Sequence, residues 1–351
     1  MKIIILTFVL FFFNSNSFSS TDFDYQSWYQ ERYNFFKKYK TRLKLLREKN
    51  KNYNGVIVET IKGEVYTLFD IKPQSQIDKA GLEHCNKQGG KKCKVRIRSF
   101  KINPNYNRLA VYNEKEKKLD VGNFEFHVEK VLNYKDITFL NNSKNFNIQS
   151  PNFSCNSVRG KNKQITDFFL KEIDIYPEDF IKKTGLKFVV LCGDISANSS
   201  NPIGLAPSHY DKSPGVFYIS LKRIRQMISA RKAKVIRHTF HHELYHVIDA
   251  KLTLIDLDNE WSKINKNPYS KTLIVSNLKL LNDGKGFITN YAKNNVSEDK
   301  AEVFANLIND YKATKEIIKN DKIIFKKTQL MISRLKKISP SINKNFWDNL
   351  N

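Results

Sequence analysis

The stretch AKVIRHTFHHELYHVIDAK, residues 233–251, decides how this chain is interpreted. Its apolar residues recur at intervals of three and four, which predicts a helix that buries one face. Inside it stands HELYH, residues 242–246. Residues four apart lie on one face of a helix, so His242 and His246 can bind one metal ion while Glu243 handles a water proton. This spacing is typical of the zinc site of a peptidase.

A catalytic zinc site needs three protein ligands and one open position for water, so a third ligand must come from elsewhere. The pattern in which a Gly and a third His follow the motif is excluded, because Asp249 and Leu252 occupy those positions. The best downstream helix is SEDKAEVF, residues 297–304, in which Glu298 and Glu302 share a face. One of them can bind zinc while the other accepts a hydrogen bond from a ligand imidazole.

Three pieces of sequence stand in order along the chain: HELYH at 242–246, Tyr291, and EDKAEVF at 298–304. Together they resemble the gluzincin zinc peptidases, and most of all the anthrax lethal factor and Pro-Pro endopeptidase group. In that group a Tyr stands seven residues before the ligand Glu, as Tyr291 does before Glu298. The resemblance covers roughly residues 186–310.

The resemblance implies a zincin-like domain in which Glu298 is the third zinc ligand and Glu302 holds a ligand imidazole. It also implies that Tyr291 donates to the developing oxyanion, and the alternative is a tyrosine of the core. Two positions depart from the group: His241 directly precedes the motif, and Tyr245 stands where members often have Gly. Substrate preference is therefore not carried over.

We expect one Zn²⁺ per chain, held by His242, His246 and Glu298, and hydrolysis of peptide bonds by metal-activated water with Glu243 as general base. Asp249, about one turn beyond His246, either orients a histidine or forms an exposed salt bridge. Two other classes stay open: a zinc amidase acting on cell-wall peptide, and a non-catalytic, toxin-like module with a structural metal. A structural metal site would need neither a general base nor an oxyanion donor. The presence of Glu243 and Tyr291 therefore argues against the non-catalytic, toxin-like module.

The predicted fold class is α+β, with a small α+β module at residues 21–150 and a zincin-like metallopeptidase domain at residues 151–351. The boundary is placed in the Asn/Ser-rich stretch 141–154. The peptidase domain should contain a small sheet, an active-site helix and a glutamate helix. Residues 215–221 are expected to form its edge strand, along which an extended polypeptide substrate can pair.

Residues 1–20 have the features of a signal peptide: a positive start, an apolar run over 3–13, and small residues after it. The apolar run is too short to span a membrane stably, since a spanning helix needs about 20 apolar residues. We therefore expect an exported protein, secreted or periplasmic. Export permits disulfides, and the four cysteines are expected to pair as Cys85–Cys93 and Cys155–Cys192.

The formal net charge of the chain is +25. Lysine is spread along the whole sequence together with abundant Asn and Ile, and no Arg-rich patch or nucleic-acid-binding motif stands out. We therefore expect no nucleic-acid partner.

Overall fold

The computed structural model describes residues 25–59, 65–89, 93–102, 110–121, 125–149, 152–160, 162–197, 200–206, 215–252, 258–270, 272, 274 and 278–350. The predicted signal peptide at 1–20 lies outside these residues. The chain divides into two compact units, Met1–Asn107 and Arg108–Asn351.

The smaller unit is an antiparallel sheet with two helices. Its elements are α1 (Tyr25–Lys49), β1 (Asn54–Glu59), β2 (Val65–Asp70), α2 (Gln74–Lys87), β3 (Lys94–Arg98) and β4 (Lys101–Ile102). The strand order is β2-β1-β3-β4. Helix α2 packs on β1, and the core between them includes Val56, Val58 and Ile77. The Cys85–Cys93 disulfide closes the turn between α2 and β3, as predicted.

In the described part of the chain, the larger unit contains two sheets. Its strands are β5 (Val111–Asn113), β6 (Lys118–Asp120), β7 (Glu125–Tyr134), β8 (Ile137–Asn142), β9 (Phe146–Gln149), β10 (Asn152–Cys155), β11 (Phe188–Cys192), β12 (Ile195–Ala197), β13 (Gly204–Leu205) and β14 (Val216–Ser220). The main sheet has the order β13-β14-β11-β8-β7-β6-β5, and β12-β10-β9 form a second sheet. The pairs β8–β11 and β11–β14 are parallel, while the other pairs are antiparallel. The fold is therefore mixed α and β, as predicted.

The division between the compact units falls at residues 107 and 108, whereas the sequence led us to expect a boundary near residue 150. Backbone pairing explains the difference, because β8 is hydrogen-bonded to β11 over Phe188↔Thr138 to Leu191↔Asn141. The Cys155–Cys192 disulfide, also predicted, joins β10 to β11. Residues on both sides of position 150 thus belong to one core.

The prediction that residues 215–221 form an edge strand is wrong. Strand β14 lies between β11 and β13, with Gly204 opposite Ile219 and Leu205 opposite Tyr218. Glycine permits this close approach, because a Cβ at position 204 would lie 2.7 Å from the Phe217 ring. The edge on this side of the main sheet is therefore the short strand β13.

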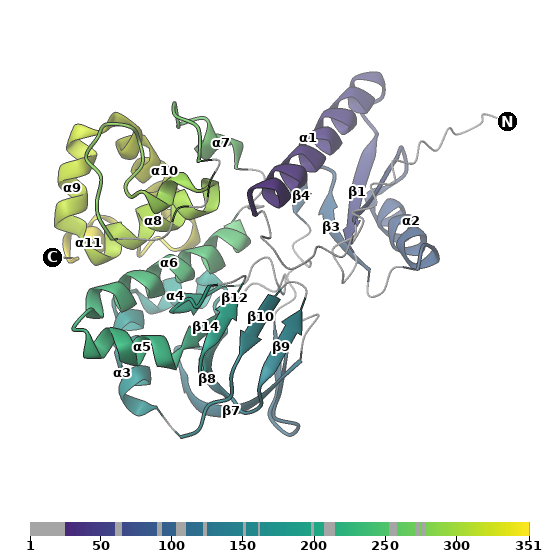
Figure 1. Ribbon diagram of the computed structural model, residues 1–351. Helices are drawn as coiled ribbons and strands as arrows, with labels where there is room; N and C mark the ends of the chain where they lie inside the picture. Colours follow the sequence, from purple (N-terminus) through teal and green to yellow (C-terminus); the bar gives the residue numbers. More distant parts are fainter. Residues whose placement is uncertain are drawn as a thin grey trace. The chain divides into compact units, whose positions relative to one another are not determined.

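The helices of the larger unit are α3 (Lys163–Asp174), α4 (Glu178–Thr184), α5 (Leu221–Ser229), α6 (Ala233–Leu252), α7 (Asn259–Ser262), α8 (Val296–Asn309), α9 (Tyr311–Asn320), α10 (Lys322–Ile338) and α11 (Lys344–Asp348), with a 3₁₀ turn η3 (Tyr291–Lys293). Helix α6 contacts β13 and β14 on one side and α8 on another (Figure 1). Helix α8 in turn packs against α9, α10 and η3. The helix that carries both predicted histidine ligands therefore lies between the sheet and the C-terminal helices.

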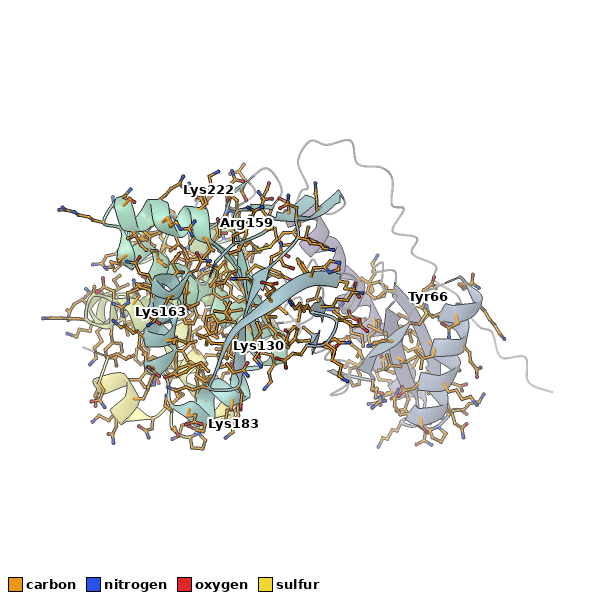
Figure 2. The ribbon with its side chains drawn as sticks, turned by 90° about the horizontal axis from the view of Figure 1, so that it is seen from below. Tyr66, Lys130, Arg159, Lys163, Lys183 and Lys222 are labelled. Atoms are coloured by element: carbon orange, nitrogen blue, oxygen red, sulfur yellow. A yellow bond between two sulfur atoms is a disulfide. The ribbon has the colours of Figure 1, made fainter. Side chains whose placement is uncertain are left out.

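Exposed basic side chains come from many elements of the larger unit. Figure 2 labels examples on β7, on the segment before α3, and on α3, α4 and α5: Lys130, Arg159, Lys163, Lys183 and Lys222. The high positive charge is thus spread over separate surfaces. Among the helices in the described part of the chain, none is both long and apolar enough to cross a membrane.

Candidate metal centre

Two helices position the predicted ligands. Helix α6 buries Phe240, Leu244 and Ile248, so its register against its neighbours is fixed by packing. Helix α8 begins with Asn295, whose side-chain oxygen accepts hydrogen bonds from the backbone N–H groups of Ser297 and Glu298 at 2.9 and 3.0 Å. This N-cap defines where α8 starts and holds its first turn against α6.

His242, His246 and Glu298 converge at one point between the two helices. The His242 Nε2 atom lies 3.1 Å from His246 Nε2 and 2.9 Å from Glu298 Oε2. The distance from His246 Nε2 to Glu298 Oε2 is 3.5 Å. One atom from each side chain lies within 4.8 Å of the other two, a spacing at which all three can ligate one metal ion. The structure thus brings together the three residues that the sequence nominated as ligands, and we call them the triad.

The other ring nitrogen of each histidine faces a fixed partner. His242 Nδ1 lies 2.8 Å from Glu302 Oε1, and His246 Nδ1 lies 3.1 Å from Ser297 Oγ. An ionised carboxylate can only accept, so His242 donates from Nδ1, which leaves Nε2 as the nitrogen that can bind a metal. Two imidazole nitrogens and a carboxylate oxygen that face one another at these distances can surround one cation. The donor set fits zinc, which prefers His nitrogen and carboxylate oxygen.

The electrostatics of the centre favour positive charge. Burial alone would raise the pKa of the Glu298 carboxyl, but His246 and His242 beside it hold that pKa well below its usual range. Burial likewise opposes ionisation of Glu302, and His238 and His242 lower its pKa well below the ordinary value. Burial would lower the pKa of His242, yet the two carboxylates raise it well above normal. Both acids are therefore ionised and suited to a bound cation.

Glu243 is turned toward the sheet edge. Its Oε2 atom accepts a hydrogen bond from the backbone N–H of Ala206 at 2.7 Å, directly after β13. Its carboxylate is largely buried. The backbone of the edge segment therefore fixes the predicted general base.

Tyr291 lies on the other flank, in the turn η3. Its ring centroid is 5.7 Å from that of His242. The turn is tied to the centre by Thr289, whose hydroxyl donates to Glu302 Oε2 at 2.7 Å.

Three further residues of helix α6 have defined surroundings. His238 is buried with its Nε2 atom 2.9 Å from Glu302 Oε1, and it forms a second possible metal group with His242 and Glu302. His241 is buried between Tyr176 Oη, at 2.8 Å, and a carboxylate of α3. Asp249 is fully buried, with Lys300 Nζ 2.6 Å from its Oδ2 atom. The exposed salt bridge offered as one alternative for Asp249 is therefore wrong.

Sequence reasoning missed Ser297, Thr289 and Ala206. Ser297 directly precedes Glu298 in the first turn of α8, so its proximity to the centre could have been expected once α8 was placed. Ala206 acts through its backbone, and the contact joins residues 37 positions apart, so no side-chain pattern signals it.

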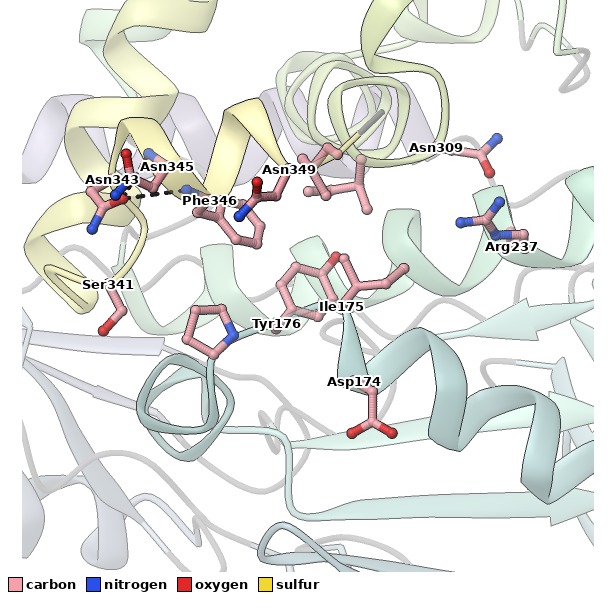
Figure 3. A pocket seen from close by; sticks show the side chains of 13 residues that line it. Asp174, Ile175, Tyr176, Arg237, Asn309, Ser341, Asn343, Asn345, Phe346 and Asn349 are labelled. Atoms are coloured by element: carbon pink, nitrogen blue, oxygen red, sulfur yellow. Dashed lines mark hydrogen bonds between the residues drawn. The ribbon is translucent and has the colours of Figure 1, made fainter.

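A separate cavity of about 650 Å³ lies between α11, the α3–α4 connection and the end of α8. Figure 3 shows its lining, which includes Tyr176, Arg237, Asn309 and Phe346. The triad does not contribute to this lining. Tyr176 connects the cavity to α6 through its hydrogen bond to His241.

The geometry defines a class: a chain with two histidines of an HExxH helix and a glutamate of a second helix arranged as a metal site. The sequence model of a protein family described as "Putative zinc-binding metallo-peptidase" matches residues 163–347, more than half of the chain. The protein therefore belongs to this family of zinc-binding metallopeptidases.

One solved structure, described as "a putative zinc-binding metallo-peptidase" from Bacteroides caccae, is similar at 18% sequence identity. The similarity covers 54% of this chain and 76% of that one, with a TM-score of 0.34. No curated protein matches the sequence significantly.

Proposed function

We propose that this protein is an exported zinc-dependent peptidase of the gluzincin type, with one zinc per chain bound by His242, His246 and Glu298. The observation that carries the proposal is the facing of two imidazole Nε2 atoms, 3.1 Å apart, with a carboxylate oxygen beside them. Family membership supports the peptidase activity. The two disulfides support export, because such bonds persist in oxidising compartments.

His242, His246 and Glu298 would hold the zinc ion, which would supply a bound water of lowered pKa and a positive charge near the carbonyl oxygen. Proton transfer and stabilisation of the developing charge are assigned to side chains of the protein. Glu243 takes a proton from the attacking water and passes it to the leaving amine. The Ala206 N–H holds one oxygen of that carboxylate, which leaves the other for the proton. Tyr291 donates a hydrogen bond to the charge that develops on the carbonyl oxygen.

The substrate is proposed to be a polypeptide that extends along the edge of the main sheet. Strand β13 is that edge, and the residue that follows it contacts Glu243. A peptide paired with this strand would pass the general base, and backbone hydrogen bonds would supply affinity. The arrangement supports a zincin-like domain, in which sheet edge and HExxH helix lie side by side.

The test is the Glu243→Gln variant, which keeps the size of the side chain and removes the base. Hydrolysis of a quenched-fluorescent peptide library should fall by about 10²–10⁴-fold, the usual contribution of a general base. Zinc content should stay at the wild-type level, because Glu243 is outside the triad. Glu316→Gln, on an exposed pair with Lys319, is the matched control and should change neither quantity. Activity near wild type, or cleavage of cell-wall fragments without cleavage of peptides, would contradict the proposal.

A further inference from the structure

Thr289 stands two residues before Tyr291 and is completely buried. Its hydroxyl makes two hydrogen bonds in different directions. It donates to Glu302 Oε2 at 2.7 Å, and it accepts from the backbone N–H of Ala292 at 3.1 Å. A hydroxyl has one proton to donate, so these two roles are compatible and directional. One side chain thus joins the turn that carries Tyr291 to the carboxylate that holds His242.

Glu302 is the shared acceptor of this arrangement. Its Oε1 atom lies 2.8 Å from His242 Nδ1 and 2.9 Å from His238 Nε2, while Thr289 occupies its Oε2 atom. Both imidazoles approach the same oxygen. The Thr289 hydroxyl therefore fixes the second oxygen, and with it the plane of the carboxylate that orients the His242 ring.

The same hydroxyl also binds the backbone of the turn η3, whose N-cap residue is Asn290. Ala292 is three residues after Thr289, the spacing at which a Thr side chain satisfies a free N–H group at the start of a helical turn. This contact ties the turn to Thr289 and thereby constrains where the Tyr291 ring lies relative to His242.

We propose that Thr289 is a positioning residue that couples the zinc ligand His242 to the oxyanion donor Tyr291 through Glu302. The proposal rests on the proposed function, because it assigns those two roles to His242 and Tyr291. It adds that the geometry of the two is set jointly, by a residue that touches neither metal nor substrate. An error of about 1 Å in such a geometry can cost about 100-fold in rate.

Thr289→Val tests the coupling, because valine keeps the shape of threonine and lacks the hydroxyl. We expect zinc affinity, measured by competition with a chelator, to fall by about 10-fold, the low end for loss of a group that orients a ligand. The kcat should fall by about 10–100-fold with KM nearly unchanged. Thr289→Ser retains the hydroxyl and should restore both quantities to within a few-fold of wild type.

Thr314→Val is the matched control. Thr314 is also completely buried, and its hydroxyl donates to the Asn306 carbonyl oxygen at 3.0 Å. This variant should leave zinc affinity and kcat unchanged. If Thr314→Val reproduces the losses of Thr289→Val, those losses reflect general destabilisation and the proposal is overturned.

A double-mutant cycle with Tyr291→Phe isolates the coupling. In the Tyr291→Phe background, Thr289→Val should still weaken zinc binding but should lower kcat much less than it does in the wild type. Equal effects on kcat in both backgrounds would overturn the coupling, as would wild-type zinc affinity in Thr289→Val. The measurement of zinc affinity requires no hydrolysis. It therefore separates failure of this proposal from failure of the proposed function, which Glu243→Gln tests.

Discussion

Helix α8 carries two carboxylate clusters from neighbouring positions, and the partners of the two clusters differ. Glu298 and Glu302 face imidazole rings of α6, and in the described part of the chain no lysine or arginine pairs with either. Asp299 faces Lys327, whose Nζ atom lies 2.6 Å away, and also accepts hydrogen bonds from Trp261 and Tyr269.

From this difference we infer that Asp299 has a structural role, whereas Glu298 is the candidate metal ligand. A buried carboxylate that is neutralised by an ammonium group and neutral donors has its charge satisfied within the protein. The Glu298 cluster instead brings a carboxylate against imidazole nitrogens, whose contacts can be satisfied either by protons or by a bound metal ion. One turn of helix thus carries both the anchor of the C-terminal helices and a candidate metal ligand.

The largest expected effect is on stability, and it comes from breaking the buried ion pair between Asp299 and Lys327. Lys327→Met keeps most of the side-chain volume but leaves Asp299 as an unpaired buried charge, which typically costs about 3–5 kcal/mol. The free energy of unfolding in denaturant should fall by this amount. Lys319→Met, which removes an exposed ammonium paired with Glu316, is the control and should change stability by less than about 1 kcal/mol. Equal stability of the two variants would show that the buried pair is not an anchor.

Low pH should also destabilise the larger unit, over the pH range in which the Asp258 carboxylate becomes protonated. Burial opposes ionisation of Asp258, but hydrogen bonds from Arg334 and the nearby Lys300 lower its pKa from 3.8 to about 2. A folded-state pKa below the unfolded value stabilises the protein above about pH 4, and this stabilisation is lost as pH falls toward 2. The linked free energy is about 2 kcal/mol.

Asp258→Asn should therefore reduce the loss of stability between about pH 4 and pH 2, measured by denaturant unfolding at each pH. Glu260→Gln removes only the exposed partner of Arg334 and should leave that loss unchanged. An unaltered pH profile in Asp258→Asn would assign the acid sensitivity to other groups.

The smallest effect is expected on zinc affinity, from replacing Glu302, the residue that accepts a hydrogen bond from His242. Glu302→Gln should weaken zinc binding by about 10–100-fold, as expected for a group that holds a ligand without touching the metal. Chelator competition measures the change. Complete loss of metal would instead indicate that Glu302 is itself a ligand, as in the alternative group with His238.

The sequence predicted the two helices that carry the candidate ligands, because the relevant spacings are local. His242 and His246 are one helical turn apart, and Glu298 follows its cap at the start of α8. The contacts that complete the site are not local. Ser297 meets His246 across 51 residues, and periodicity within a helix contains no information about such a contact.

The fold was predicted less completely for a related reason. The Asn/Ser-rich stretch 141–154 predicted a domain boundary near residue 150, yet Asn141 and Asn142 end the central strand β8. The Asn142 side chain is fully buried and donates to the Cys155 carbonyl oxygen at 2.7 Å. Composition indicated a loop, whereas this specific hydrogen bond gives the buried amide NH₂ group a partner inside the core.

The most direct test of the account is the zinc content of the purified protein and of its Glu298→Ala variant, determined by elemental analysis after exposure to zinc. We predict one zinc per wild-type chain. In Glu298→Ala the affinity should fall by more than the about 10–100-fold expected for an orienting group, so little zinc should remain after dialysis. Stoichiometric zinc in Glu298→Ala, or none in the wild type, would contradict the account.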